Sequence, residues 1–511
     1  MNEVRAGVIL SFLTLALTNI VALVLTPYML RSFGQSEYGL YVLIGTLVSH
    51  LSLLDLGLGT AVVRYVAHYR AMKDRRAEEN FLATCAAIYG LIGLLIIGAG
   101  AALYHGLPMI FPNLTPTELE LAQKLFIVLI IDLAVSIPGS IFQSICTGYE
   151  HYFYPRLFGV ARICMRSLCL FGLLLFGYRA FAVVLMDALF NAARLLSLLG
   201  YVFFRLKVRL VLHHFERAAV RELFGYSFWI FVGVLVDQLY WRLGQTILGI
   251  IADTSVVAIF AIGIQLTLYL AALSTAISSV FLPRAAAMEA ANAPDEEVTG
   301  VMIRVGRMQF LVLGCAFTGF VCLGRLFIKL WAGPAYLTAW PIALIMMVPL
   351  MLPLVQNYGI ALLQARNKHA VRSLMYLSFA VVNIFIGYLL AKQYGGLGMA
   401  AGTALSLIMG QGFAINFYYH FRMGLNIPRF FKELSAGLGL AFLLVLAAGL
   451  AIAALPGSSW TAFCVKSAAL VAVYAGLMWS FGMRKDEKQL VISLLHPLKN
   501  IAEQTIPAGQ A

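Results

Sequence analysis

Residues 53–70 read LLDLGLGTAVVRYVAHYR, an apolar segment that contains one carboxylate, Asp55, and ends in basic residues. Asp55 is followed by Gly57 and Gly59, and the basic end begins at Arg64. A carboxylate is costly inside lipid, and small residues let helices approach closely. We therefore predict a structural or gating role for these four residues at the end of a transmembrane helix. Asp55 is expected to accept hydrogen bonds from a neighbouring helix end or to pair with Arg64.

The rest of the chain is equally apolar. Of its 511 residues, 61% are hydrophobic and 12% are charged, and the mean hydropathy is +0.89. Soluble domains have about 25% charged residues, so the composition excludes a soluble protein. Apolar runs of about 20 residues, the length that crosses a bilayer, recur along the chain. We predict an all-α polytopic membrane protein with about fourteen transmembrane helices, the first of them a retained span and not a signal peptide.

The formal charge of +13 fits membrane topology better than a nucleic-acid partner. Basic residues gather in cytoplasmic loops of membrane proteins. If the N-terminus is inside, most of the 36 Lys and Arg residues fall in predicted cytoplasmic loops, for example Arg70, Lys73 and Arg75. We therefore predict a multi-pass protein whose N- and C-termini are both cytoplasmic.

A faint internal repeat predicts the domain organisation. An offset of about 217 residues places the outer turn at Ser36 onto the turn at Asp253, and repeats of one orientation are common in transporters. We predict two six-helix lobes related by a pseudo-two-fold axis along the membrane normal. The predicted parts are an N-terminal lobe at 1–210, a C-terminal lobe at 211–432, an extra helix pair at 433–483 and a cytoplasmic tail at 484–511. Apolar residues at helical spacing from Leu490 to Leu498 are consistent with a short interfacial helix in the tail or with a tail of no specific role.

Ionisable residues at membrane depth are the main candidates for function. The carboxylates are Asp55, Asp132, Asp187 and Asp237, and the guanidinium groups are Arg162, Arg166, Arg194 and Arg242. Arg162 and Arg166 share a face of one predicted helix, because they are four residues apart. Asp187, Asn191 and Arg194 share a face of the next. Lys466 is a further embedded cation that is able to snorkel.

Two interpretations of these charges stay open. In the first, the Asp and Arg residues pair and hold helices together. In the second, they line an aqueous cavity, where the planar fork of arginine suits phosphate. The second interpretation makes Arg166, Arg194, Arg242, Arg162 and Asn191 candidates for binding an anionic substrate. It makes Asp132, Asp187 and Asp237 candidates for ion coupling. No metal site is expected, because the seven cysteines lack zinc spacing, and no cofactor is expected beyond a coupling H⁺ or Na⁺.

Residues 26–70 read TPYMLRSFGQSEYGLYVLIGTLVSHLSLLDLGLGTAVVRYVAHYR. This segment resembles the bacterial polysaccharide-biosynthesis membrane proteins, the O-antigen and oligosaccharide flippases of the multidrug/oligosaccharidyl-lipid/polysaccharide exporter superfamily. The resemblance is carried by LRSFGQSEYGLY as the first outer turn and by LDLGLGTAVVRYVA at the end of the second span. It implies alternating access that moves an undecaprenyl-pyrophosphate-linked oligosaccharide to the outer leaflet of the bacterial inner membrane. Coupling to an ion gradient or to the membrane potential is also implied.

One feature departs from the family. Lipid II flippases of this superfamily take several cavity arginines from their first two spans, whereas Arg31 here lies at the outer end of the first span. The expected partners are the lipid-linked oligosaccharide, membrane lipids and polysaccharide assembly enzymes, and we expect a monomer that is not an enzyme. The alternatives are a cation-coupled drug exporter and a membrane glycosyltransferase or polysaccharide polymerase. The embedded arginines disfavour the exporter, and the lack of a large outer loop disfavours the enzymes.

Overall fold

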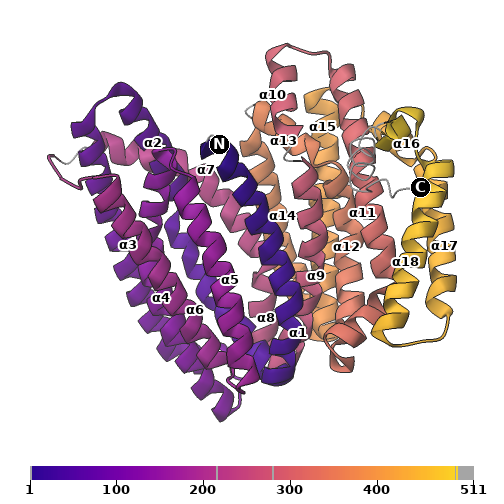
Figure 1. Ribbon diagram of the computed structural model, residues 1–511, viewed down its shortest axis with the longest axis horizontal. Coiled ribbons are helices and arrows are strands. Elements are labelled where there is room, and N and C mark those ends of the chain that lie inside the picture. The colour runs from indigo at the N-terminus through magenta and orange to yellow at the C-terminus, as the bar shows by residue number, and fades with distance from the viewer. Residues whose placement is uncertain (1–2, 215–216, 279–280, 367, 490, 493–511) are drawn as a thin grey trace, which may run out of the picture. The chain divides into compact units, whose positions relative to one another are not determined.

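The computed structural model describes residues 3–214, 217–278, 281–366, 368–489 and 491–492, and all of the regular structure in these residues is helical (Figure 1). The helices up to residue 251 are α1 (Glu3–Leu51), η1 (Ser52–Asp55), α2 (Leu58–Met72), α3 (Arg75–Ile110), α4 (Pro116–Gly148), α5 (Phe153–Leu175), α6 (Ala180–Gly200), η2 (Tyr201–Arg205), α7 (Arg217–Trp241) and α8 (Leu243–Ile251). The later helices are α9 (Thr254–Ser278), α10 (Leu282–Ala290), α11 (Asp295–Trp331), η4 (Pro334–Tyr336), α12 (Ala339–Val355), α13 (Tyr358–Ala365), α14 (His369–Leu407), η5 (Ile408–Ala414), α15 (Ile415–Met423), α16 (Ile427–Ser435), α17 (Leu438–Ala454), α18 (Trp460–Leu477) and η6 (Met478–Gly482).

The predicted all-α polytopic membrane fold is confirmed. In the described residues, ten helices are long and apolar enough to cross a membrane. The number rises to twelve if each of two bent helix pairs, α12 with α13 and α16 with α17, is one span. Two of the ten candidates contain a break within them, because α1 bends at Gly34 (φ 76°) and α14 bends at Gly395 (φ 56°). Positive φ is a conformation that glycine adopts without steric cost.

The helices form two compact units. Unit 1 consists of Met1–Gln265 and Ser373–Ser406, and unit 2 of Leu266–Arg372 and Leu407–Ala511. The units interleave along the chain, so they do not test the lobe boundaries predicted from the repeat, which stay a prediction. The predicted tail helix lies mostly outside the described residues, because 490 and 493–511 are not described.

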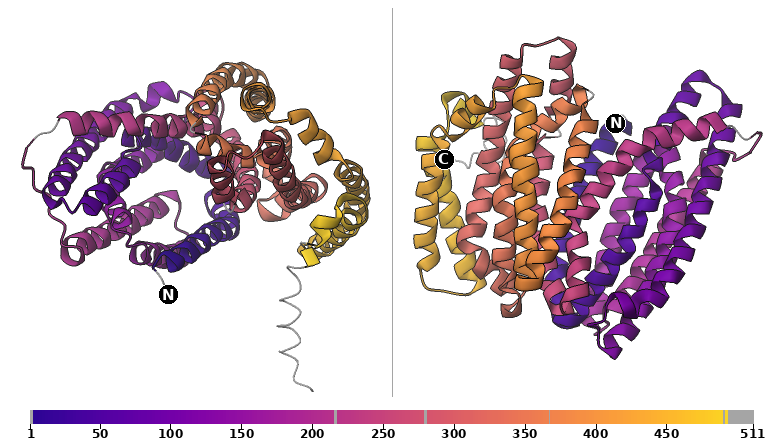
Figure 2. Two further views of the ribbon diagram at one scale, coloured as in Figure 1. Left: turned by 90° about the horizontal axis from the view of Figure 1, so that it is seen from above. Right: turned by 180° about the vertical axis from the view of Figure 1, so that it is seen from behind.

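In unit 1, α3, α4, α5 and α6 run side by side (Figures 1 and 2). Hydrogen bonds join the turns at one end of the unit: the Glu118 carboxylate accepts from the hydroxyls of Ser36 (2.5 Å) and Thr254 (2.8 Å). The Glu37 carboxylate accepts from the backbone N–H of Ala180 (2.9 Å). Ser36 and Thr254 therefore lie together, which agrees with the prediction that the turns at Ser36 and Asp253 are on one side.

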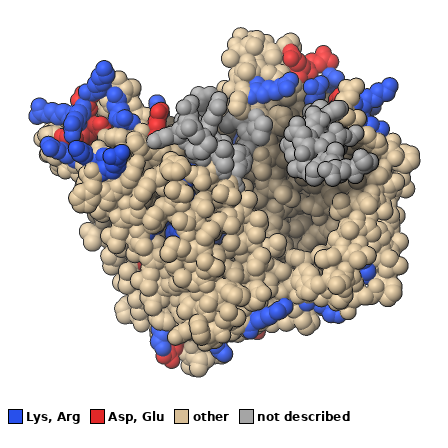
Figure 3. Space-filling model, viewed as in Figure 1, with Lys and Arg blue, Asp and Glu red and all other residues tan. Residues whose placement is uncertain are grey.

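The space-filling view shows where charge lies on the helices. In Figure 3 the Lys, Arg, Asp and Glu side chains gather at the ends of the helices, and the surface between these ends is almost entirely uncharged. Many large apolar side chains on the helix flanks are exposed, among them Leu94 on α3 and Leu168 on α5. This arrangement is what a bilayer requires, since lipid takes the place of water along the flanks.

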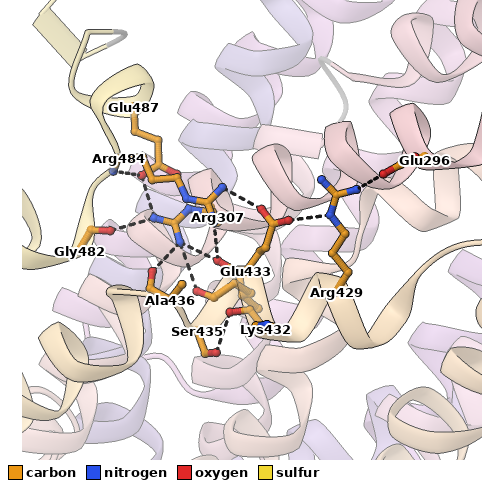
Figure 4. Close-up of polar contacts among 11 residues, drawn as sticks. Glu296, Arg307, Arg429, Lys432, Glu433, Ser435, Ala436, Gly482, Arg484 and Glu487 are labelled. Atoms are coloured by element: carbon orange, nitrogen blue, oxygen red, sulfur yellow. Dashed lines mark hydrogen bonds and ion pairs between the residues drawn. The ribbon is translucent and has the colours of Figure 1, made fainter.

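In unit 2, the last helices pack on α11 through an apolar core that includes Leu323, Leu438, Val445 and Leu470. Arg307 of α11 adds a polar anchor (Figure 4). Its side chain is 1% exposed, forms a two-bond ion pair with Glu487 (2.5 and 3.0 Å) and donates to the carbonyls of Glu433, Ala436 and Gly482.

Lys466 of α18 is buried, and its ammonium group donates to the carbonyls of Ala453, Leu455 and Gly457. These carbonyls lie at or beyond the end of α17, where a helix leaves carbonyl groups without intrahelical partners. The embedded lysine therefore has a structural explanation.

Candidate functional site

A cavity of about 510 Å³ opens within unit 1 between α1, α5 and α6. Its wall combines apolar side chains of α1, such as Val21 and Leu25, with three guanidinium groups. Arg162 and Arg166 come from α5, and Arg194 comes from α6. The helical spacing of the sequence therefore brings three of the predicted substrate-binding residues to one cavity.

Arg166 is paired. Its Nε and Nη2 atoms donate to the two carboxylate oxygens of Asp187 on α6, each at 2.6 Å. The two side chains are 27% and 29% exposed, so the pair is partly shielded from its surroundings. The pair is bidentate, which adds geometric specificity to charge attraction. For these two residues the geometry matches the interpretation of paired charges that hold helices together.

Arg162 and Arg194 differ from Arg166. The Nε atom of each is buried and has no hydrogen-bond partner among the described residues. Neither forms an ion pair with another described residue. A buried donor without a partner is costly. A hydrogen-bond acceptor in the cavity would therefore be favoured at both guanidinium groups.

Asp132 of α4 has neutral partners. Its carboxylate accepts from the side-chain amide of Asn191 on α6 (2.8 Å) and from the Ser136 hydroxyl (3.4 Å). Asn191 also contacts Ser136. The Asn191 amide is thus committed to α4, and Asn191 is not among the residues that line the cavity.

Asp237 and Arg242 lie elsewhere in unit 1. Asp237 is exposed on α7, and Arg242 is exposed at the break between α7 and α8. Neither residue lines the cavity with Arg162, Arg166 and Arg194. The structure therefore brings together only part of the predicted set.

The segment that opens the sequence analysis is a break and not a continuous span. The helix of α1 ends in the short turn η1, which holds Asp55, and α2 begins after Leu56 (φ 52°) and Gly57 (φ 72°). Asp55 lies near Tyr89 of α3, but among the described residues the buried Tyr89 hydroxyl has no hydrogen-bond partner. The expected hydrogen bond from a neighbouring helix end to Asp55 therefore stays a prediction.

The glycines at this break serve close packing. A Cβ atom on Gly57 would lie 2.7 Å from the Ile230 side chain of α7, and one on Gly59 would lie 3.2 Å from the Ser144 hydroxyl of α4. Among the described residues Arg64 forms no ion pair with Asp55. Its guanidinium group lies 4.6 Å from the centre of the Tyr226 ring, in the geometry of a cation–π contact.

The cavity offers recognition of negative charge by its guanidinium groups. Among the described residues there is no group of three or more His, Cys, Asp or Glu side chains that could hold a metal ion. Two guanidinium groups whose Nε atoms have no hydrogen-bond partner among the described residues, next to an apolar wall, suit an acidic group attached to an apolar chain. The sequence could not reveal which arginines have partners, because that depends on how α5 and α6 face each other.

Comparisons with known proteins found a matching family model and a relative. Residues 4–289 match the family model described as "Polysaccharide biosynthesis protein". The "Putative O-antigen transporter" of Shigella flexneri is 21% identical over 410 residues, which cover 77% of this chain and 92% of that relative.

The fold is similar to those of solved transporters. The lipid II flippase MurJ in an inward closed conformation has a TM-score of 0.72 at 13% identity, covering 92% of this chain and 97% of that one. An inward-facing multidrug resistance MATE family transporter of the MOP superfamily has a TM-score of 0.56 at 14% identity, covering 76% and 96%. These similarities show that the all-helical fold of this chain is similar to those of MurJ and MATE transporters.

Proposed function

Because the chain belongs to the polysaccharide biosynthesis protein family, we propose that it is a flippase for a lipid-linked oligosaccharide. Its substrate is an oligosaccharide on undecaprenyl pyrophosphate, which it moves from the cytoplasmic to the outer leaflet for cell-surface polysaccharide assembly. The O-antigen relative, which matches most of this chain, supports the choice of substrate class.

One observation carries this proposal. Arg162 and Arg194 present buried Nε donors without partners to a cavity at membrane depth. Such groups are tolerated in a membrane only if they meet water, a carboxylate or an anionic ligand. A diphosphate supplies several acceptor oxygens for two guanidinium groups, and the polyprenyl chain suits the apolar wall and the lipid. A site for an organic cation would call for the opposite charge, which disfavours a drug exporter.

We place the two lobes of the sequence repeat in a fourteen-span arrangement. The two longest candidate spans have 60 and 54 residues, about twice or more the length that crosses a bilayer, and each is bent at a glycine of positive φ. If each of these two helices is counted as two spans, the ten candidates become twelve. Counting each of the two bent helix pairs as one further span gives fourteen. The basic loop after α2 then lies in the cytoplasm, and alternating access between the lobes moves the headgroup.

Coupling to H⁺ or Na⁺ is part of the proposal, and Asp132 is its best-placed carrier. A proton on Asp187 would break a two-bond ion pair with Arg166. The hydrogen-bond partners of Asp132 are a neutral amide and a hydroxyl, so its protonation breaks no ion pair. Asp237 stays a third candidate.

The proposal is tested in cells that lack their own copy of this gene and carry a plasmid copy. The test variant is Arg162→Gln/Arg194→Gln, and the matched control is Arg179→Gln/Arg205→Gln, which removes the same charge near the two ends of α6. We expect the control to restore surface polysaccharide and the test variant to restore at most about a tenth of it, since removing charged hydrogen bonds costs about 1.5–3 kcal/mol each. Full restoration by a test variant that reaches the membrane in normal amount would reject the proposal.

A further inference from the structure

A second cavity lies at one end of unit 1, apart from the cavity of Arg162 and Arg194. It has a volume of about 400 Å³ and is lined by the end of α2, the start of α3, Tyr149 and the segment 206–209. Five Lys and Arg residues line it against two Glu residues. We call this cavity the basic pocket, and its cations are Arg70, Lys73, Arg75, Lys207 and Arg209.

Both acids of the basic pocket are already occupied. Glu78 is buried, and its carboxylate accepts from the Tyr149 hydroxyl at 2.6 Å. Burial and the Glu78 carboxylate raise the pKa of Tyr149, so this hydroxyl stays protonated and keeps donating at neutral pH. Glu79 pairs with Arg75 (3.3 Å) and lies 3.3 Å from the His213 ring.

Four cations of the basic pocket have no such partner. Among the described residues, Arg70, Lys73, Lys207 and Arg209 form no ion pair. Arg70 lies over the Tyr149 ring, 4.1 Å from its centre, which fixes its position and leaves the donors of its planar group available. Like charges held around one cavity repel each other, so the pocket favours an anion that they share.

The chain places these cations with some backbone strain. Lys73 (φ 56°) and Lys207 (φ 53°) both adopt the left-handed conformation, which is unfavourable for residues other than glycine. The segment that carries Lys207 and Arg209 is held against α3, because the Asn80 side chain accepts from the backbone N–H groups of His213 and His214, each at 3.0 Å. Two segments far apart in sequence are thus fixed around one pocket.

We propose that the basic pocket binds a phosphate group, as found in the headgroup of an anionic membrane lipid. The pocket lies at the end of a unit whose flanks are apolar, so a lipid headgroup reaches it while the acyl chains stay beside the helices. A Lys or Arg near an anionic surface contributes about 1 kcal/mol to binding, and four of them give a site that neutral lipids do not fill. The choice of the cytoplasmic leaflet rests on the proposed orientation, but the binding of phosphate does not.

The test uses the full-length protein in nanodiscs of phosphatidylcholine and measures its thermal unfolding midpoint while one probe is added. One arm adds phosphatidylglycerol to the nanodisc, and the other adds inorganic pyrophosphate to the buffer. The test variant is Lys73→Gln/Arg209→Gln. The matched control is Arg76→Gln/Arg205→Gln, which removes two exposed cations from the same two segments without touching the pocket lining.

We expect phosphatidylglycerol to raise the midpoint of the wild type and of the control, with an apparent affinity at least tenfold weaker in the test variant. If pyrophosphate acts in the same way, the pocket binds phosphate from either source; if only the lipid acts, the source is the membrane. Equal responses of the test variant and the control in both arms would overturn the proposal. The variant Lys73→Arg/Arg209→Lys keeps both charges and controls for misfolding. We expect it to bind phosphatidylglycerol as the wild type does. If this variant folds but does not bind, the proposal is also overturned.

Transport is not measured in this experiment, so its failure and the failure of the proposed flippase function are distinguishable. Loss of lipid binding in a variant that still restores surface polysaccharide would leave the proposed function intact and limit the basic pocket to lipid recognition.

Discussion

At the scale of single residues, three arginines of one cavity have different roles. Arg166 is neutralised by Asp187, whereas Arg162 and Arg194 have Nε donors without partners among the described residues. Arg166 thus joins α5 to α6, whereas Arg162 and Arg194 line the cavity without such a pair. The interpretation of paired charges therefore describes Arg166 and Asp187, and anion binding by Arg162 and Arg194 stays our proposal.

The Arg166–Asp187 pair gives the prediction at this scale. Asp187→Asn leaves a guanidinium group partly shielded from its surroundings without its ion pair, and we expect it to lower the free energy of unfolding by about 1–3 kcal/mol. The double variant Arg166→Met/Asp187→Asn removes both charges, so its loss should be smaller than the sum of the losses in Asp187→Asn and Arg166→Met. Thermal unfolding of the four proteins in one detergent measures this coupling. Additive losses would show that the pair does not stabilise the contact of α5 with α6.

At the scale of helices, the sequence predicted the membrane spans but not the break within the second of them. The sequence predicted the apolar runs, because their length and composition follow from the bilayer. It did not predict that the second span is broken at η1, or that Leu56 is left-handed at the break (φ 52°). Gly57 was a visible signal for this break, since its positive φ and its approach to α7 both exclude a side chain.

Gly57 provides a prediction for this break. Gly57→Ala should lower the thermal stability of the protein by about 1–3 kcal/mol, because the new methyl group meets Ile230 and the φ of 72° is strained for alanine. Gly45→Ala in the preceding helix is the control, since a Cβ atom there meets nothing within 4 Å. If both variants unfold at the same temperature, the break is not held by close packing.

Arg307 makes a contact between helices that could not be predicted from the sequence. In the sequence Arg307 is a basic residue next to an apolar run, but the structure buries it against Glu487 and four backbone carbonyls (Figure 4). Those partners lie more than a hundred residues away along the chain, so no local pattern announces them. The contact joins α11 to the segment before α17 and to the segment after α18.

Replacement of Arg307 tests this anchor. Arg307→Ala removes the ion-pair partner of the buried Glu487 carboxylate and the hydrogen-bond donor of several carbonyls, and the loss of a buried pair costs about 3–5 kcal/mol. We expect faster proteolysis in the segment around residues 482–487 and a lower unfolding midpoint. Arg304→Ala, at an exposed position on the same helix, is the control and should behave as the wild type. Equal proteolysis of the two variants would contradict the role of Arg307 as an anchor.

At the scale of the whole molecule, composition and charge predicted the class of protein and the resemblance predicted its family. Both follow from properties that are spread over the chain, so they survive at 21% identity to a relative. The candidate site was predicted only in part, because Asp237 and Arg242 share a helix with no residue of the cavity. Which embedded charges meet depends on helix packing, and single-helix spacing relates only residues of one helix.

The central claim is that Arg162 and Arg194 receive the diphosphate of a polyprenyl lipid. The most direct measurement is the binding of undecaprenyl pyrophosphate to the purified full-length protein in nanodiscs, with uncharged undecaprenol as the comparison ligand. We predict that the wild type and the Arg179→Gln/Arg205→Gln control bind the diphosphate at least tenfold more tightly than undecaprenol, and that Arg162→Gln/Arg194→Gln loses this preference. An unchanged preference in that folded double variant would contradict the claim.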